Sequence, residues 1–177
     1  MLKSKIIGIV IVALIAAVLI FAATKPDKFS VERAASIKAP PEKIFGLISD
    51  FQHWGAWSPW EKKDPAMKRT FGVATSGKGA MYAWEGNKDV GEGSMEIAES
   101  VPSSKITIKL DFLKPFEAHN LVDFTLEPKG DATNVTWSMH GPMPYISKVI
   151  SIFCSMDSMI GKDFEAGLAN LKAIAEK

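Results

Sequence analysis

The chain has 177 residues, of which 23% are charged and 47% hydrophobic, and this composition is ordinary for one folded domain with a short appendage. Its formal net charge of +1 provides no overall positive field, so we expect no nucleic-acid partner. Cys154 is the only cysteine, which excludes a disulfide framework within the chain and a cysteine-rich metal site. We expect no metal and no cofactor.

The first element is an apolar segment long enough to cross a membrane. Ile6–Ala23 is a run of 18 residues without a charge, amide or proline, and a helix of this length spans about 27 Å, close to the roughly 30 Å of a bilayer core. Because Lys3 and Lys5 precede the run, a cleaved secretory signal is the main alternative. The run is long for a signal peptide and lacks a good cleavage site, so we expect an uncleaved single-pass anchor.

The anchor defines a simple organisation. Residues 1–28 form the membrane anchor and a short linker, and residues 29–177 form one ligand-binding domain. The leader before the helix is very short, which favours a cytoplasmic amino terminus and an extracytoplasmic domain, although Lys25, Lys28 and Arg33 compete with the leader lysines.

The domain begins with a strand and a short helix. Phe29–Ile37 alternates apolar and polar residues and is followed by Pro40 and Pro41, which cannot continue a strand but suit the first turn of a helix. Ile44, Leu47, Ile48 and Phe51 then repeat at helical spacing.

The segment from Met67 to His140 alternates between short apolar–polar runs and turn residues, which is typical of an antiparallel sheet. Six strands are predicted, over Lys68–Val73, Ala80–Trp84, Gly93–Ser100, Lys105–Phe112, Glu117–Glu127 and Thr133–His140. In the fourth of these, Ile106 and Ile108 share one face while Lys105 and Lys109 share the other, so one face of the sheet is covered and the other is wet.

The remaining residues predict what covers the sheet. From Ile146 to Leu171, apolar residues recur every three or four positions, which indicates a single long helix. A strongly curved antiparallel sheet wrapped around one long C-terminal helix buries every apolar face. The predicted fold is therefore α+β, a helix-grip domain preceded by a transmembrane helix.

Several short motifs occur in an order that resembles the polyketide cyclase/dehydrase branch of the START-like (SRPBCC) superfamily. They are Ile37, Ala39-Pro40, Phe45, Asp50-Phe51, Trp54, Trp57-Ser58-Pro59-Trp60, Gly79, Trp84, Gly86, Gly91-Glu92-Gly93, Thr133-Asn134-Val135-Thr136-Trp137, Asp163-Phe164-Glu165 and Gly167-Leu168. The resemblance spans about residues 29–176. It implies a helix-grip fold with a deep cavity between sheet and helix that binds a hydrophobic small molecule, such as a lipid or polyketide. It transfers no catalytic motif.

Candidate cavity residues are large apolar side chains on the covered faces, because aromatic and thioether groups suit an irregular apolar ligand. They are Tyr82, Trp84, Leu110, Phe124, Trp137, Met139 and Phe153. Plain core packing is the alternative for each. Trp54, Trp57 and Trp60 are expected to form a plug at the cavity mouth.

Asp157 is the unusual residue in this set, because a helical wheel places it within the apolar stripe of the last helix. It is a candidate anchor for a ligand head group. The alternatives are an ion pair with Arg33, Lys62 or Lys63, or a bend of the helix that exposes it.

Three function classes follow from these features. The first is a membrane-anchored domain that binds a hydrophobic small molecule. The second is a cyclase, dehydratase or hydrolase with Tyr82, Asp157 or His119 as acid–base groups, which requires polar groups to converge in the cavity. The third is a protein-interaction module, which requires an exposed apolar patch on the outer face of the sheet.

Overall fold

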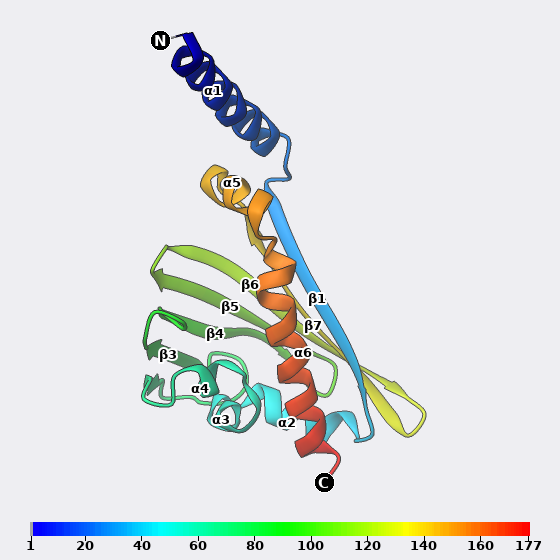
Figure 1. Cartoon of the computed structure of the whole chain (residues 1–177). Helices are drawn as coiled ribbons and strands as arrows, with labels where there is room; N and C mark the ends of the chain where they lie inside the picture. The colour runs from blue at the N-terminus through cyan, green and yellow to red at the C-terminus, as the bar shows by residue number, and fades with distance from the viewer. Residues whose placement is uncertain (1) are drawn as a thin grey trace.

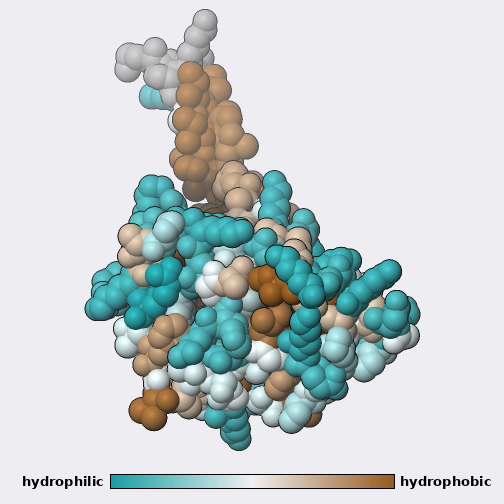
Figure 2. Space-filling view, turned by 90° about the horizontal axis from the view of Figure 1, so that it is seen from below, coloured by the Kyte–Doolittle hydropathy of each residue, from teal (hydrophilic) through white to brown (hydrophobic). Residues whose placement is uncertain are grey.

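The computed structural model describes residues 2–177, with side chains from Lys5 onward. It begins with helix α1 (Leu2–Ala23), which stands away from the rest of the chain (Figure 1). Figure 2 shows α1 as a continuous hydrophobic rod beside a largely hydrophilic domain surface. The stretch Lys5–Ala23 could cross a membrane by its length and composition, and only 6% of it is buried. A signal sequence near the amino terminus would have the same properties.

The domain is built on a seven-stranded antiparallel sheet in the order β1-β7-β6-β5-β4-β3-β2. Six of these strands closely match those predicted between Met67 and His140. The remaining strand matches the one predicted at Phe29–Ile37. Their bounds are β1 (Lys28–Ile37), β2 (Lys68–Phe71), β3 (Met81–Glu85), β4 (Glu92–Val101), β5 (Lys105–Lys114), β6 (Ala118–Lys129) and β7 (Ala132–Pro142). Register shifts in β4 next to Gly93 and Glu99 accompany the curvature of the sheet.

The two faces of the sheet differ as the alternation predicted. Ile97, Ile106 and Ile108 are fully buried on the inner face. On the outer face, Lys105 pairs with Glu99 at 3.1 Å. The sheet thus has one wet and one covered face, and the α+β helix-grip prediction is confirmed.

Four short helical segments follow β1 and cover one end of the inner face (Figure 1). They are α2 (Pro41–Ser49), the 3-10 turn η1 (Phe51–His53), α3 (Trp54–Trp57) and α4 (Trp60–Lys63). Pro41 occupies the first turn of α2, where the missing N–H leaves no helical bond unmade. Ile44 and Ile48 of α2 are fully buried against the sheet.

The predicted single C-terminal helix is instead two helices, α5 (Tyr145–Phe153) and α6 (Met156–Ala175). Cys154 adopts an extended backbone. Ser155 then caps α6, and its hydroxyl oxygen accepts a hydrogen bond from the Ser158 N–H at 3.1 Å. A side-chain cap satisfies one of the free N–H groups of a new helix, so it stabilises a second start at this position. Because apolar residues recur at helical spacing on both sides of this break, the sequence pattern predicted one continuous helix.

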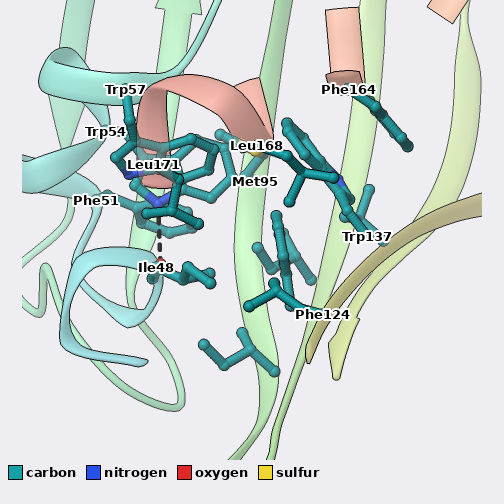
Figure 3. Close-up of a cluster of buried hydrophobic side chains, with 14 of the residues drawn as sticks. Ile48, Phe51, Trp54, Trp57, Met95, Phe124, Trp137, Phe164, Leu168 and Leu171 are labelled. Atoms are coloured by element: carbon teal, nitrogen blue, oxygen red, sulfur yellow. Dashed lines mark hydrogen bonds between the residues drawn. The ribbon is translucent and has the colours of Figure 1, made fainter. Parts of the chain in front are cut away.

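The last helix packs diagonally across the inner face and forms the core with it (Figure 3). Leu168 and Leu171 are buried. Trp137 of β7 stacks on Phe164 of α6 with a centroid separation of 4.1 Å. Gly167 permits this close approach, since a Cβ there would lie 2.6 Å from the Trp137 ring.

The amino-terminal end of α6 is tied to β1 by an ion-pair cluster. The Arg33 guanidinium contacts the Asp157 carboxylate at 2.8 Å and the Glu165 carboxylate at 2.6 Å. The Asp157 side chain is 60% exposed, because it reaches Arg33 of the edge strand β1 and does not enter the interior. The predicted role of Asp157 as an anchor inside the cavity is therefore corrected to a partly exposed ion pair with Arg33.

Replacing Trp137 by Ala should lower the free energy of unfolding by about 3–5 kcal/mol, the usual cost of truncating a buried aromatic side chain. Trp137 is 2% exposed and lies on an inner strand of the sheet. Urea unfolding of the full chain in detergent, followed by near-ultraviolet circular dichroism, measures this loss. Phe116→Ala is the control, since Phe116 is 77% exposed. Equal stability of the two variants would contradict the packing described.

Replacing Asp157 by Asn should remove a pH dependence of stability. The hydrogen bond from Arg33 lowers the pKa of Asp157, so the pair stabilises the folded state above the unfolded pKa of about 3.9 and loses this effect as pH falls through the lower folded value. Melting curves should differ at pH 7 and converge at the acid end. Asp131→Asn, in the exposed β6–β7 turn, should follow the wild type at every pH. A constant Asp157→Asn deficit would contradict this.

Candidate functional site

A cavity of about 550 Å³ lies between the inner face of the sheet, α4, α5 and the amino-terminal half of α6. This volume is in the range of roughly 300–1,000 Å³ that small-molecule sites occupy. Its walls are predominantly apolar. Phe164 lies at the boundary between the cavity and the solid core. The next inward-facing residues of α6, Leu168 and Leu171, pack in that core.

Five of the predicted ligand-contacting residues line this cavity. They are Tyr82 and Trp84 of β3, Leu110 of β5, and Trp137 and Met139 of β7. The alternation of each strand brings these side chains to the same face, and the curvature of the sheet turns them toward one space. Leu110 and Phe112 are only half-buried although Ile106 and Ile108, earlier on the same face of β5, are fully buried, as expected for residues that face a hollow.

Three predicted residues lie elsewhere. Phe124 is fully buried behind the cavity wall, with its ring centroid 4.9 Å from that of Trp137. Phe153 is 77% exposed because α5 ends there and does not continue along the sheet. Asp157 pairs with Arg33 of the edge strand β1. These three are corrections to the predicted lining.

The three tryptophans after α2 form part of the inner wall and core, so the prediction of a plug at the mouth was wrong. Trp57 is fully buried in the core. Trp54 and Trp60 line the cavity. The Trp54 indole N–H donates to the Ile48 carbonyl at 2.9 Å, drawn as a dashed line in Figure 3. This bond fixes the loop against the end of α2.

The cavity wall contains an unpaired hydrogen-bond donor. The indole N–H of Trp137 is buried and has no hydrogen-bond partner among the described residues. By contrast, the N–H groups of Trp54, Trp57 and Trp84 each donate to a backbone carbonyl within 3.0 Å. A buried donor without a partner costs about 1–3 kcal/mol, and the aromatic rings of Trp57, Phe124 and Phe164 that pack around Trp137 offset that cost.

A polar corner lies at the α4 end of the cavity and was not predicted. The Tyr82 hydroxyl donates to the Glu61 carboxylate at 2.7 Å, and Arg69 contacts the same carboxylate at 2.6 Å. Burial, together with the hydrogen bond to Glu61, raises the pKa of Tyr82, so this hydroxyl stays protonated at neutral pH. Glu61 and Arg69 are brought together only by the tertiary fold, and no local sequence signal marks them.

The acid–base candidates do not converge. His119 lies at the exposed rim, where its Nδ1 atom contacts the Asp111 carboxylate at 2.6 Å. This contact raises the pKa of His119. Tyr82 is at the opposite, buried end, and Asp157 is outside the cavity lining, paired with Arg33 of β1. Catalysis by these three residues together is therefore not supported.

The cavity opens where its lining residues become exposed to solvent. Phe116 in the β5–β6 turn is 77% exposed, and Ile146 and Ile150 of α5 are 65% and 48% exposed. All three line the cavity, so they form a hydrophobic rim. Figure 1 shows the β5–β6 turn and α5 on the side of the domain nearest α1.

Solved structures with the same fold cover almost the whole domain. Protein CV1439 from Chromobacterium violaceum is 15% identical with a TM-score of 0.59, over 86% of this chain and 99% of that chain. Protein MLL2253 from Mesorhizobium loti is 17% identical with a TM-score of 0.61, over 82% and 96%. The KanY protein is 16% identical with a TM-score of 0.62, over 85% and 99%. These likenesses establish the fold alone.

A search of curated proteins gave no match. The family model for polyketide cyclase / dehydrase and lipid transport matches residues 28–176. That range begins at the first residue of β1 and ends just after α6, so it covers every element that builds the cavity. The resemblance seen in the sequence motifs is thereby confirmed, and the chain belongs to the polyketide cyclase/dehydrase and lipid-transport family of the START-like superfamily.

Proposed function

We propose that the protein binds a hydrophobic small molecule, lipid-like or polyketide-like, in the cavity, while α1 holds the domain in a membrane. The observation that carries the proposal is a roomy, predominantly apolar cavity. A ligand with a predominantly apolar body would fill this space and bury its surface there.

Binding is favoured over catalysis by the state of the polar groups. Glu61 is held by both Arg69 and Tyr82, so its carboxylate is fixed and already paired rather than free to act as a base. The raised pKa of Tyr82 opposes its use as a base at neutral pH. A general acid–base mechanism needs groups whose pKa lies near the working pH.

A protein-interaction role through the outer face of the sheet is less supported. That face carries ion pairs, including Lys105 with Glu99 and Lys109 with Glu96 at 3.1 and 3.4 Å. Thr107 donates a hydrogen bond to Asp123 on this face. Its exposed apolar residues Val101 and Leu121 each lie opposite a lysine on the neighbouring strand. A charged, self-paired surface is a poor hydrophobic docking site.

Membrane anchoring is supported by the exposure of α1. Apart from the half-buried Val18, its large apolar side chains from Ile6 to Phe21 are 42–69% exposed, a surface that water disfavours and lipid accepts. Residues 1–28 would then serve as anchor and linker for the domain over 29–177. We propose an extracytoplasmic position for that domain, because Lys3 and Lys5 precede the apolar run of α1.

The anchor predicts that the full chain stays in the membrane pellet after washing with alkaline carbonate, since a membrane-spanning helix resists a treatment that releases peripheral proteins. The membrane-bound protein should retain its original amino terminus, which intact-protein mass spectrometry measures. Lys3 and Lys5 would be present in that mass. A soluble chain beginning near Lys25 would show a cleaved signal and overturn the anchor.

Cavity binding predicts that a bulky residue at Leu110 blocks occupancy. Full-chain protein in detergent is incubated with oleic acid, and native mass spectrometry counts bound fatty acid. Leu110→Trp fills space inside the cavity, so affinity should fall at least about tenfold, which corresponds to about 1.4 kcal/mol.

The matched control is Leu121→Trp, the same substitution on the outer face of β6, where Leu121 is 40% exposed. It should bind oleic acid like the wild type. Equal binding by all three proteins would place the fatty acid outside the cavity. No binding by the wild type would reject a fatty-acid-like ligand.

A further inference from the structure

Large apolar side chains are exposed along one face of α5. Ile146, Ile150 and Phe153 are 65%, 48% and 77% exposed. Their spacing of four and three residues places them in one stripe along the helix. Single exposed apolar residues are ordinary on protein surfaces, but a continuous stripe indicates a surface that meets another apolar phase.

The β5–β6 turn extends this stripe to a second element. Leu113, near the end of β5, and Phe116, in the turn itself, are 52% and 77% exposed. Figure 1 shows this turn and α5 together on the side of the domain nearest α1, while the β6–β7 turn and the carboxyl end of α6 point away from it. Exposed large apolar groups thus gather on the α1 side.

The position of α5 beside α1 is fixed by specific contacts. The Tyr145 hydroxyl donates to the Leu19 carbonyl of α1 at 2.7 Å. Lys148, whose side chain is 9% exposed, contacts the Asp27 carboxylate just after α1 at 2.5 Å. The Met143 N–H donates to the Asp27 carbonyl at 2.7 Å. These bonds prevent α5 from swinging freely about the link between α1 and β1.

The contacts also set the depth of α5. Leu19 precedes the end of α1 at Ala23 by four residues, which is about 6 Å along the helix axis. If α1 spans the bilayer, the Tyr145 hydroxyl lies at the boundary between head groups and acyl chains. Amphipathic helices bury their apolar faces about 5–10 Å into this region, and tyrosines concentrate there.

We propose that the apolar stripe of α5 and the tip of the β5–β6 turn lie in the surface of the bilayer that α1 spans, so that the cavity mouth opens directly onto lipid. This inference rests on the anchor and cavity of the proposed function. The rim residues Phe116, Ile146 and Ile150 then meet the acyl region, and a hydrophobic ligand passes between bilayer and cavity without crossing water.

Lipid contact is tested with residues outside the cavity lining, so that cavity occupancy cannot affect the result. On a Cys154→Ser background, Leu113→Cys and Phe153→Cys each carry the fluorophore NBD in full-chain proteoliposomes of phosphatidylcholine. Phosphatidylcholine with a doxyl group near the head group should quench both labels several-fold more than a label at Val73→Cys, in the β2–β3 loop. Val73 is fully exposed.

Quenching no greater than at Val73 would overturn the proposal. A label shielded from aqueous iodide but not quenched by doxyl lipid would show that a protein surface, from a second copy or another chain, covers the stripe instead. That result would also overturn it.

A second measurement concerns ligand entry. In the Leu113→Asp/Phe153→Asp variant, α1 still holds the chain in the vesicle, but two charges oppose contact with lipid. Uptake of a pyrene-labelled fatty acid from donor vesicles, followed by energy transfer from tryptophan, should be about tenfold slower than in the wild type, equivalent to about 1.4 kcal/mol.

Binding of oleic acid by this variant in detergent should be unchanged. Slower uptake with unchanged binding supports the proposal. Unchanged uptake overturns it while leaving cavity binding intact, whereas loss of oleic acid binding in the wild type rejects the proposed function itself. The two failures are thus distinguishable.

Discussion

The stack of Trp137 on Phe164 divides the interior of the domain into two parts. The rings lie 4.1 Å apart with an angle of 10° between their planes, and Gly167 lets the helix backbone approach that close. Beyond the stack, Leu168 and Leu171 of α6 pack into a solid core with α2 and the tryptophan loop. Before it, the same helix covers the cavity with Met156 and Ile160.

This division explains how a small domain tolerates a large hollow. A cavity of this size lacks the close packing that normally stabilises a protein interior. The aromatic cluster around Trp57, in the solid core, offsets this loss of packing. The ring centroids of Trp54, Phe124 and Trp137 all lie within 6.1 Å of that of Trp57. The close packing is concentrated at the end away from the cavity, so the cavity walls can remain apolar and open.

The sequence predicted the sheet well because its information is local. Alternation identified the strands and their buried faces. Five of the eight predicted site residues, in β3, β5 and β7, line the cavity for that reason. The prediction that Phe124 faces inward was also right, but Phe124 lies in the core behind the cavity wall. Alternation predicts which side chains face inward and does not distinguish the core from the cavity. That distinction depends on how far the opposing helix lies from each strand.

The errors had two different causes. Phe153 was misplaced because periodicity continued across a helix break, although Ser155 followed by an acidic residue in the first turn is a recognisable helix start. Asp157 was misplaced because its partner Arg33 is 124 residues away in the sequence. Glu61 and Arg69 were missed because their meeting with Tyr82 depends on segments that pair only in the folded domain. A local signal could have corrected the first error, whereas the second needed the tertiary structure.

The helix break that the sequence concealed is also what gives the domain a mouth. A continuous helix from Tyr145 onward would carry the α5 residues along the axis of α6, away from the contacts that tie α5 to α1. The extended backbone at Cys154 instead redirects the chain, so that Ile146 and Ile150 line the cavity while Tyr145 reaches Leu19. One short interruption therefore places the entrance of an apolar cavity beside the apolar helix, and the polar corner at Glu61 remains at the closed end.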